Sequence, residues 1–89
     1  MKLVTVNDII IGKVYEAKRP SLVGNIFTPF VNDRQIRWIS DDRLLVQYDS
    51  PTVKNGRNYP TITIEKFLKW VGRDVTTEMP EGNWRTSFK

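Results

Sequence analysis

The 89-residue sequence contains neither cysteine nor histidine. Without cysteine, the chain can form no disulfide bond and offers no thiolate to a metal ion. Without histidine, it lacks the commonest zinc ligand, the usual general base and the usual pH switch. Gly24 and Gly56 stand alone, so there is no glycine-rich phosphate-binding loop. The acidic spacing of an EF-hand is missing too, and we expect neither a metal ion nor a cofactor.

Little in the sequence is typical of an active site. Acid–base chemistry would have to rely on Asp, Glu, Tyr or Lys, and Asp41-Asp42 is the only adjacent pair of carboxylates. This pair lies in a predicted turn beside Arg43, where water solvates both groups and no apolar pocket would raise a pKa. The Ser and Thr hydroxyl groups have no histidine to activate them. We therefore expect a protein that is not an enzyme.

Long hydrophobic runs are absent as well. No stretch is long enough to span a membrane. Asn7 and Asp8 interrupt the apolar N-terminal segment, and no signal-peptide cleavage site follows it. We expect a soluble protein of the cytoplasm, or of the host cytoplasm if a phage encodes it. The length fits one domain over residues 1–75, followed by a partly ordered tail, residues 76–89, that could dock on it.

Residues 34–48, with the sequence RQIRWISDDRLLVQY, are the most informative segment. Two apolar runs flank a polar turn, which is the pattern of a β-hairpin. A two-residue loop at Asp41-Asp42 would leave both faces half polar. A three-residue loop, Ser40–Asp42, pairs Ile36 with Val46 and separates apolar from polar side chains. Asp also tolerates the left-handed conformation that such a loop needs, so we predict the three-residue loop.

This register gives the two faces of the hairpin different characters. The face expected in the core carries Ile36, Trp38, Leu44, Val46 and Tyr48. The face expected at the surface carries Gln35, Arg37, Arg43 and Gln47, with Ile39 and Leu45 among them. Because strand faces alternate with a period of two, a slip of one residue would exchange the two sets.

The clearest helix is predicted over about residues 63–71. Thr63 can cap its N-terminus, and Gly72 should end it in the left-handed conformation. An apolar stripe recurs at helical spacing: Ile64, Phe67, Leu68 and Val71. Strands are predicted over residues 13–18 and 59–62. A short turn that Asn7 caps and Gly12 ends precedes the first of them.

Two segments are rich in apolar residues but lack a regular pattern. Residues 20–33 form a long loop that proline and glycine interrupt. This loop either packs over an edge of the core or binds a partner. In the tail, residues 83–88 could form a further strand, or Trp84 and Phe88 could be exposed anchors for a partner.

The balance of charge suits an anionic partner. The chain carries 14 Lys and Arg against 10 Asp and Glu, a net charge of +4, although the same charge also serves solubility. Arg binds phosphates and guanine through two parallel hydrogen bonds, and Gln can read adenine. The predicted nucleic-acid-binding set is Arg37, Arg43, Gln35 and Gln47 of the hairpin, Lys18 and Arg19 after the first strand, and Lys54 and Arg57 beside the predicted Asn55-Gly56 turn. For each of these residues, a role in solubility or structure is the competing interpretation.

The order of the predicted elements is informative in itself. A turn ending at Gly12, a strand, a long loop, a central hairpin and a turn-rich connection precede YPTITIEKFLKWV, where a last strand runs into a helix. Over residues 12–71 this order resembles an SH3-like or Tudor-like small barrel, of a kind common among bacteriophage and prophage accessory proteins. The resemblance implies a mainly β fold, a barrel of about five strands with one short C-terminal helix. Proteins of this architecture that bind Pro-rich peptides or methylated side chains use aromatic grooves or cages. With Trp38 and Tyr48 expected in the core, no such cage can be assigned here.

Two functions fit these patterns. The favoured one is a non-enzymatic binding module, a small phage-type accessory protein that contacts nucleic acid, or a nucleic-acid-processing machine, through the basic hairpin face. The alternative is an adaptor or inhibitor of a host protein that uses the apolar loop, residues 22–31, and the tail aromatics. Its candidate contact residues are Phe27, Phe30, Ile39, Leu45 and Trp84. Ile39 and Leu45 could equally form a dimer seam or an edge that the tail covers, so the sequence leaves the oligomeric state open.

Overall fold

The computed structural model describes residues 3–24, 26–53 and 58–88 of the chain. Over these residues the fold is mainly β, as predicted, with one α-helix and two short 3-10 turns. The strands are β1 (Val14–Ala17), β2 (Leu22–Val23), β3 (Phe30–Val31), β4 (Arg34–Ile39), β5 (Leu45–Asp49), β6 (Thr61–Thr63) and β7 (Val71–Asp74). The helix is α1 (Ile64–Trp70), and the 3-10 turns are η1 (Val6–Asp8) and η2 (Thr76–Glu78).

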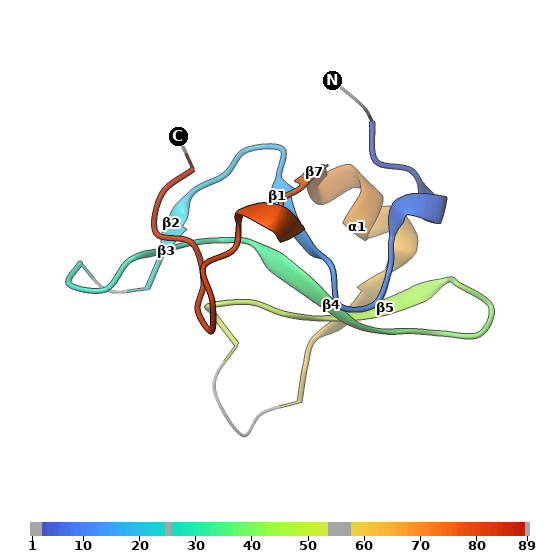
Figure 1. The fold of residues 1–89 in the computed structure, drawn as a ribbon. Coiled ribbons are helices and arrows are strands. Elements are labelled where there is room, and N and C mark those ends of the chain that lie inside the picture. Colours follow the sequence, from blue (N-terminus) through green and yellow to red (C-terminus); the bar gives the residue numbers. More distant parts are fainter. Residues whose placement is uncertain (1–2, 25, 54–57, 89) are drawn as a thin grey trace.

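Five strands form one antiparallel sheet in the order β6-β5-β4-β1-β7, and β2 pairs with β3 in a separate ribbon (Figure 1). The edge strands β6 and β7 do not pair with each other, so the sheet is open over the described part of the chain. In Figure 1, α1 lies behind this sheet and the C-terminal tail crosses in front of it. The helix and the tail therefore cover opposite faces.

The core lies between α1 and the sheet. Phe67 of the helix is fully buried, and its ring meets the edge of the buried Tyr15 ring at a centroid distance of 5.6 Å. Ile36 and Val46 of the central hairpin are fully buried in the same cluster. The apolar stripe predicted for the helix thus builds the core, because a helix of seven residues depends on such packing for its stability. The described residues include no helix that is long and apolar enough to cross a membrane.

The N-terminus of α1 is capped by a side chain, whereas its C-terminus runs directly into a strand. Thr63 caps the N-terminus as predicted, since its hydroxyl accepts a hydrogen bond from the backbone N–H of Lys66 at 3.2 Å. The predicted cap at Gly72 is wrong, because the chain becomes extended at Val71 and continues directly as β7. Gly72 lies inside that strand, where an added Cβ would come within 2.9 Å of the carbonyl oxygen of Ala17. Glycine is needed there for the close approach of β7 to β1.

The register of the β4–β5 hairpin also differs from the prediction. The observed pairs are Gln35 with Asp49, Ile36 with Tyr48, Trp38 with Gln47, and Ile39 with Val46. This pairing leaves Arg37 in a β-bulge. The backbone N–H of Ser40 donates to the carbonyl of Leu45 at 3.0 Å, so the loop between these two residues is one residue longer than predicted.

The bulge has a physical reason in the spacing of the core residues. Ile36 and Ile39 are three positions apart, and a regular strand would turn only one of them towards the core. With the bulge, both face it, and Ile39 packs against the core instead of being exposed. Trp38 then lies on the opposite face with 42% of its surface exposed, so its predicted place in the core is wrong. Leu44 is also exposed rather than buried, whereas Tyr48 packs against the core as predicted.

The C-terminal tail docks through an arginine, and the strand considered for residues 83–88 does not form. Arg85 is only 6% exposed. Its guanidinium donates to both carboxylate oxygens of the fully buried Asp33, at 2.7 Å each, and to Glu16 at 2.9 Å. These bonds raise the pKa of Arg85 against the opposing effect of its burial. The backbone N–H of Val31 also donates to the carbonyl of Arg85 at 2.8 Å.

Removal of Arg85 should therefore destabilise the whole domain. Arg85→Leu leaves the Asp33 carboxylate without its counter-charge, and we expect the free energy of unfolding in urea to fall by about 3–5 kcal/mol. Lys69→Ala is the control, because it breaks the exposed pair with Glu65 (3.5 Å) and should cost less than about 0.5 kcal/mol. Adding Asp33→Asn to Arg85→Leu should restore part of the loss. A loss below about 1 kcal/mol for Arg85→Leu would contradict this role.

Candidate nucleic-acid interface

The face of the sheet opposite α1 is covered by the tail only in part. Val14 and Glu16 of β1 are buried beneath the tail, whereas the face over β4, β5 and β6 is open. The pairing places Gln35, Trp38, Leu45, Gln47, Asp49 and Thr61 on this open side, and Arg37 joins them through a hydrogen bond to Gln35. We call these seven residues the open sheet face.

Arg37 is the accessible cation of the open sheet face. Its Nη1 donates to Oε1 of Gln35 at 3.4 Å, and its Cζ lies 5.4 Å from the centre of the Tyr59 ring. This distance is typical of a cation–π contact. No carboxylate of the described residues forms a salt bridge with Arg37. The guanidinium is thus positioned by neutral neighbours and keeps its charge available to an anion.

Trp38 gives the open sheet face a flat apolar surface. It pairs across the ladder with Gln47, whose amide donates to the Thr61 hydroxyl at 3.1 Å. An exposed indole bordered by an amide and a guanidinium can stack a base and hydrogen-bond its edge. Trp38 was not among the predicted site residues, because the alternation of a regular strand assigns it to the core.

Arg43, which was predicted to share this face, has another role. It occupies the turn between β4 and β5 with φ +59°, and its Nη2 donates to the backbone carbonyls of Val6 (3.2 Å) and Ile9 (3.4 Å). The Ser40 hydroxyl bonds the Asp42 carboxylate at 2.6 Å in the same turn and lowers the pKa of that carboxyl. Arg43 therefore ties the turn to the N-terminal segment.

Lys18 and Arg19 were predicted to join this face but lie away from Trp38. Lys18 and Arg19 are exposed, but they follow the end of β1 that runs away from Trp38 along the β1–β4 ladder. Lys54 and Arg57, with the turn predicted between them, lie outside the described residues. The structure thus brings together Gln35, Arg37 and Gln47 of the predicted set and adds Trp38 and Asp49.

An aromatic pair that could hold a cation is already occupied. The guanidinium carbon of Arg34 lies 4.2 Å from the ring centre of Tyr48 and 4.2 Å from that of Trp70. Burial lowers the pKa of Arg34. Because the chain's own cation fills the space between the two rings, this pair is not an open cage for a methylated side chain.

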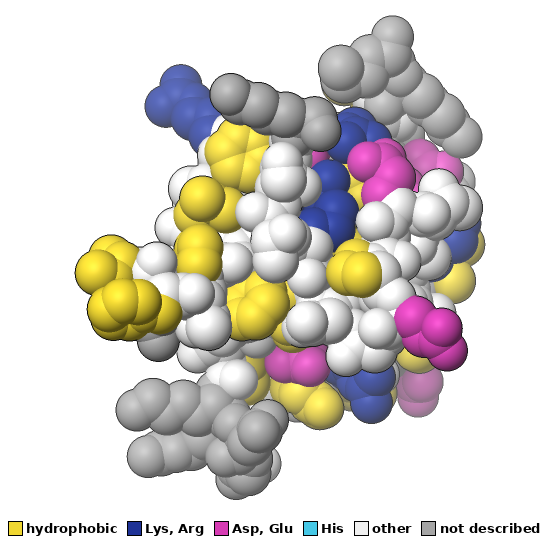
Figure 2. All heavy atoms as spheres, turned by 60° about the vertical axis from the view of Figure 1, so that its left-hand side comes forward, with side chains coloured by type: hydrophobic (Ala, Val, Ile, Leu, Met, Phe, Trp, Pro, Cys, Tyr) yellow, Lys and Arg dark blue, Asp and Glu magenta, His cyan; other side chains and the backbone are white. Residues whose placement is uncertain are grey.

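Hydrophobic side chains gather at the loop between β2 and β3. Ile26 and Phe27 are 87% and 85% exposed, and Leu22 of β2 is 51% exposed. Figure 2 brings this side of the molecule forward and shows hydrophobic side chains protruding along its left edge. Phe30 is half-buried in β3, so the most exposed apolar side chains of this segment lie at the tip of the loop, whereas Leu45 is exposed on the open sheet face.

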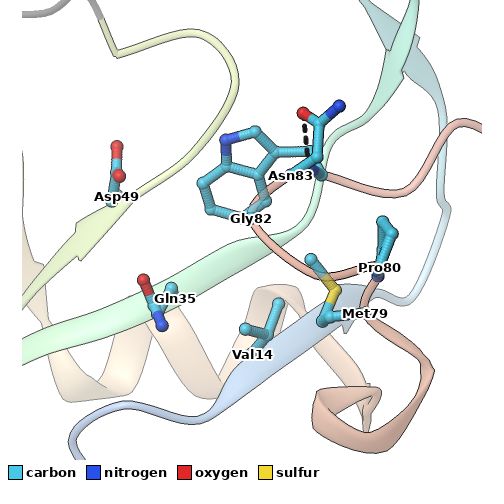
Figure 3. A pocket seen from close by; sticks show the side chains of 8 residues that line it. Val14, Gln35, Asp49, Met79, Pro80, Gly82 and Asn83 are labelled. Atoms are coloured by element: carbon cyan, nitrogen blue, oxygen red, sulfur yellow. Dashed lines mark hydrogen bonds between the residues drawn. The ribbon is translucent and has the colours of Figure 1, made fainter.

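A pocket of about 620 Å³ opens between the open sheet face and the tail (Figure 3). Its lining residues are Val14, Gln35, Asp49, Met79, Pro80, Gly82, Asn83 and Trp84. In Figure 3, Asp49 lies on the β5 side, Met79 and Pro80 lie on the tail side, and Val14 and Gln35 lie between them. Asp49 and Gln35 also belong to the open sheet face, so the pocket is continuous with it. Trp84, predicted as a partner contact, is half-buried at this pocket.

The comparisons with known proteins leave the function to be inferred from this geometry. No protein-family model matches the chain, and neither curated proteins nor solved structures give a match to it. Across the described residues, no group of three or more acidic side chains is arranged to hold a metal ion. The candidate sites are therefore the open sheet face, the pocket beside it and the exposed tip of the β2–β3 loop.

The assignment of Arg43 to the turn can be tested by its substitution. Arg43→Ala removes two hydrogen bonds from a charged donor, and we expect the free energy of unfolding in urea to fall by about 1–3 kcal/mol. Arg43→Gly should cost about 1 kcal/mol less than Arg43→Ala, because glycine adopts the positive φ without strain. Arg37→Ala, the matched control in the bulge, should change stability by less than about 0.5 kcal/mol. Equal losses for Arg43→Ala and Arg37→Ala would count against the structural role.

Proposed function

We propose that this protein is a non-enzymatic binding module that holds single-stranded nucleic acid on its open sheet face. The observation that carries the proposal is the bulge in β4, which puts Trp38 on the same exposed face as Arg37 and Gln47. A stacking ring, an unpaired guanidinium and an amide at neighbouring positions match the three features of an unstacked nucleotide: the base plane, the phosphate and the base edge.

A single strand fits this surface better than a duplex. Trp38 can stack only on a base whose face is free, and bases of a duplex already stack on one another. The open sheet face also offers one unpaired cation, Arg37, whereas duplex binders neutralise many phosphates. Figure 2 shows Lys and Arg interspersed with Asp and Glu on the adjoining side of the molecule rather than collected in one basic field. We therefore expect stacking to contribute more to affinity than charge does.

Substitutions in the open sheet face should separate stacking from charge. Trp38→Ala should weaken binding of a fluorescent single-stranded oligonucleotide by about 5- to 150-fold, because stacking on an aromatic side chain contributes roughly 1–3 kcal/mol per base. Arg37→Ala should weaken binding less and should make the salt dependence shallower by about 0.7 in log–log slope, which corresponds to one phosphate contact. Both effects can be measured by fluorescence anisotropy over a salt series.

Lys66→Ala is the matched control for charge, since Lys66 is an exposed cation on α1, on the other side of the sheet. It should leave the salt slope of the binding constant unchanged. If the native protein binds no oligonucleotide even at low salt, or if Arg37→Ala and Lys66→Ala give the same slope as the native protein, the proposed function is wrong.

A second candidate function rests on the tip of the β2–β3 loop. Ile26 and Phe27 expose most of their surface, and adjacent exposed apolar side chains are typical of sites that insert into a hydrophobic groove of another protein. On this hypothesis the protein is an adaptor or inhibitor of a protein partner. The surface is about one loop wide, so the partner would have to supply the concave side of the interface.

If the second candidate function is correct, the protein binds its protein partner directly and not through a bridging nucleic acid. The native protein should retain a specific protein from a lysate after nuclease treatment, and Ile26→Ser with Phe27→Ser should abolish that capture while thermal unfolding stays within a few degrees of the native protein. Thr28→Ala provides a control at an exposed position of the same loop. Capture that nuclease removes, or that survives the double substitution, would exclude this candidate.

A further inference from the structure

The pocket between the tail and the sheet has the dimensions of a ligand site. Its volume of about 620 Å³ lies within the roughly 300–1,000 Å³ typical of small-molecule pockets. The tail forms one wall, and its position is fixed because Arg85 is held by Asp33 and Glu16 immediately after Trp84. The pocket is therefore built by the fold rather than by a loosely attached segment.

The walls of the pocket differ in chemistry. Val14, Met79, Pro80 and Trp84 supply an apolar environment with one indole, which suits a flat ring. The charged group in the lining is the carboxylate of Asp49, a pure acceptor of hydrogen bonds. One oxygen of this carboxylate accepts the backbone N–H of Ser50 at 2.8 Å, which orients the group, and the other has no partner among the described residues.

The two amides of the pocket differ in what they leave available to a ligand. The amide nitrogen of Gln35 donates to the carbonyl of Gly12 at 3.1 Å, and its oxygen accepts from Arg37. The oxygen of Asn83 accepts the backbone N–H of Trp84 at 2.9 Å (Figure 3). The Gln35 amide is thus engaged at both its nitrogen and its oxygen, whereas the Asn83 amide keeps its nitrogen as a donor. Asp49 offers the acceptor that suits a ligand with hydrogen-bond donors on the edge of a planar ring.

We infer that this pocket takes one guanine base of the bound strand, with Trp84 against the ring and Asp49 accepting from its Watson–Crick edge. Guanine presents two adjacent donors there, the ring N1–H and the exocyclic amine, and the two oxygens of a carboxylate can accept both. Adenine and cytosine present one exocyclic amine beside an acceptor nitrogen that would face the negative charge. This inference rests on the proposed function, because Gln35 and Asp49 join the pocket to the open sheet face on which the strand would lie.

The inference is tested with two oligonucleotides that differ at one position. A short thymidine oligonucleotide with one central guanine should bind the native protein about tenfold more tightly than the same strand with a central adenine or cytosine, which corresponds to about 1.4 kcal/mol. Asp49→Asn should reduce this preference to less than about twofold, since the asparagine keeps one acceptor but loses the charge. Asp41→Asn removes the same charge from the exposed β4–β5 turn and should preserve the preference.

The outcomes distinguish a failure of the guanine pocket from a failure of the proposed function. Equal affinities for the guanine, adenine and cytosine strands overturn the guanine pocket and leave the proposed function standing. If no strand binds, the proposed function fails, and the pocket is then judged with guanosine and adenosine monophosphate alone. Guanosine monophosphate should shift the NMR signal of the Trp84 indole N–H, assigned with Trp84→Phe, and should do so more than adenosine monophosphate. No shift, or an equal shift with both nucleotides, overturns the inference.

Discussion

The ion network around Arg85 joins the C-terminal tail to β1, to β7 and to the residue that precedes β4. Its guanidinium joins the tail to Asp33, which precedes β4, and to Glu16 of β1, while Arg73 of β7 bonds Glu16 from the other side at 3.2 Å. A buried carboxylate such as Asp33 is tolerated only when its hydrogen bonds and charge are satisfied. In a chain with a small core and no disulfide bond, this network sets where the tail lies. The tail in turn decides which part of the sheet stays open and where a pocket can form.

The sequence predicts the elements of the fold better than it predicts their register. The period of the helix and the cap at Thr63 are local signals, and both are confirmed. The register of the hairpin depends instead on which isoleucines reach the core, and the bulge at Arg37 satisfies Ile36 and Ile39 together. Nothing in a strict alternation signals such a bulge, so Trp38 was assigned to the wrong face. The network of Arg85 joins residues 52 and 69 positions apart, which no local pattern could reveal.

The residues of the candidate site were likewise predicted only in part. Gln35, Arg37 and Gln47 were recognised as one polar face, and the structure brings them together. Asp49 was missed because it appeared to belong to a turn-rich connection, whereas the observed pairing extends β5 to include it opposite Gln35. The density of arginine in the hairpin was a poor guide, since Arg34 and Arg43 are used inside the fold. Whether an arginine of this hairpin stabilises the fold or is exposed depends on the bulge and the turn of the backbone, which the composition does not reveal.

The position of Arg34 between Tyr48 and Trp70 has a consequence for selectivity. Two rings at 4.2 Å on either side of a guanidinium form a cation site whose ligand is covalently tethered to it. A tethered group competes at an effective concentration on the order of millimolar or above. An external ammonium ion or methylated lysine would have to exceed that competition before it gained anything from the rings. Arg34 therefore competes with any external cation for the rings of Tyr48 and Trp70, whereas Trp38 and Trp84 lie at the open sheet face and at the pocket.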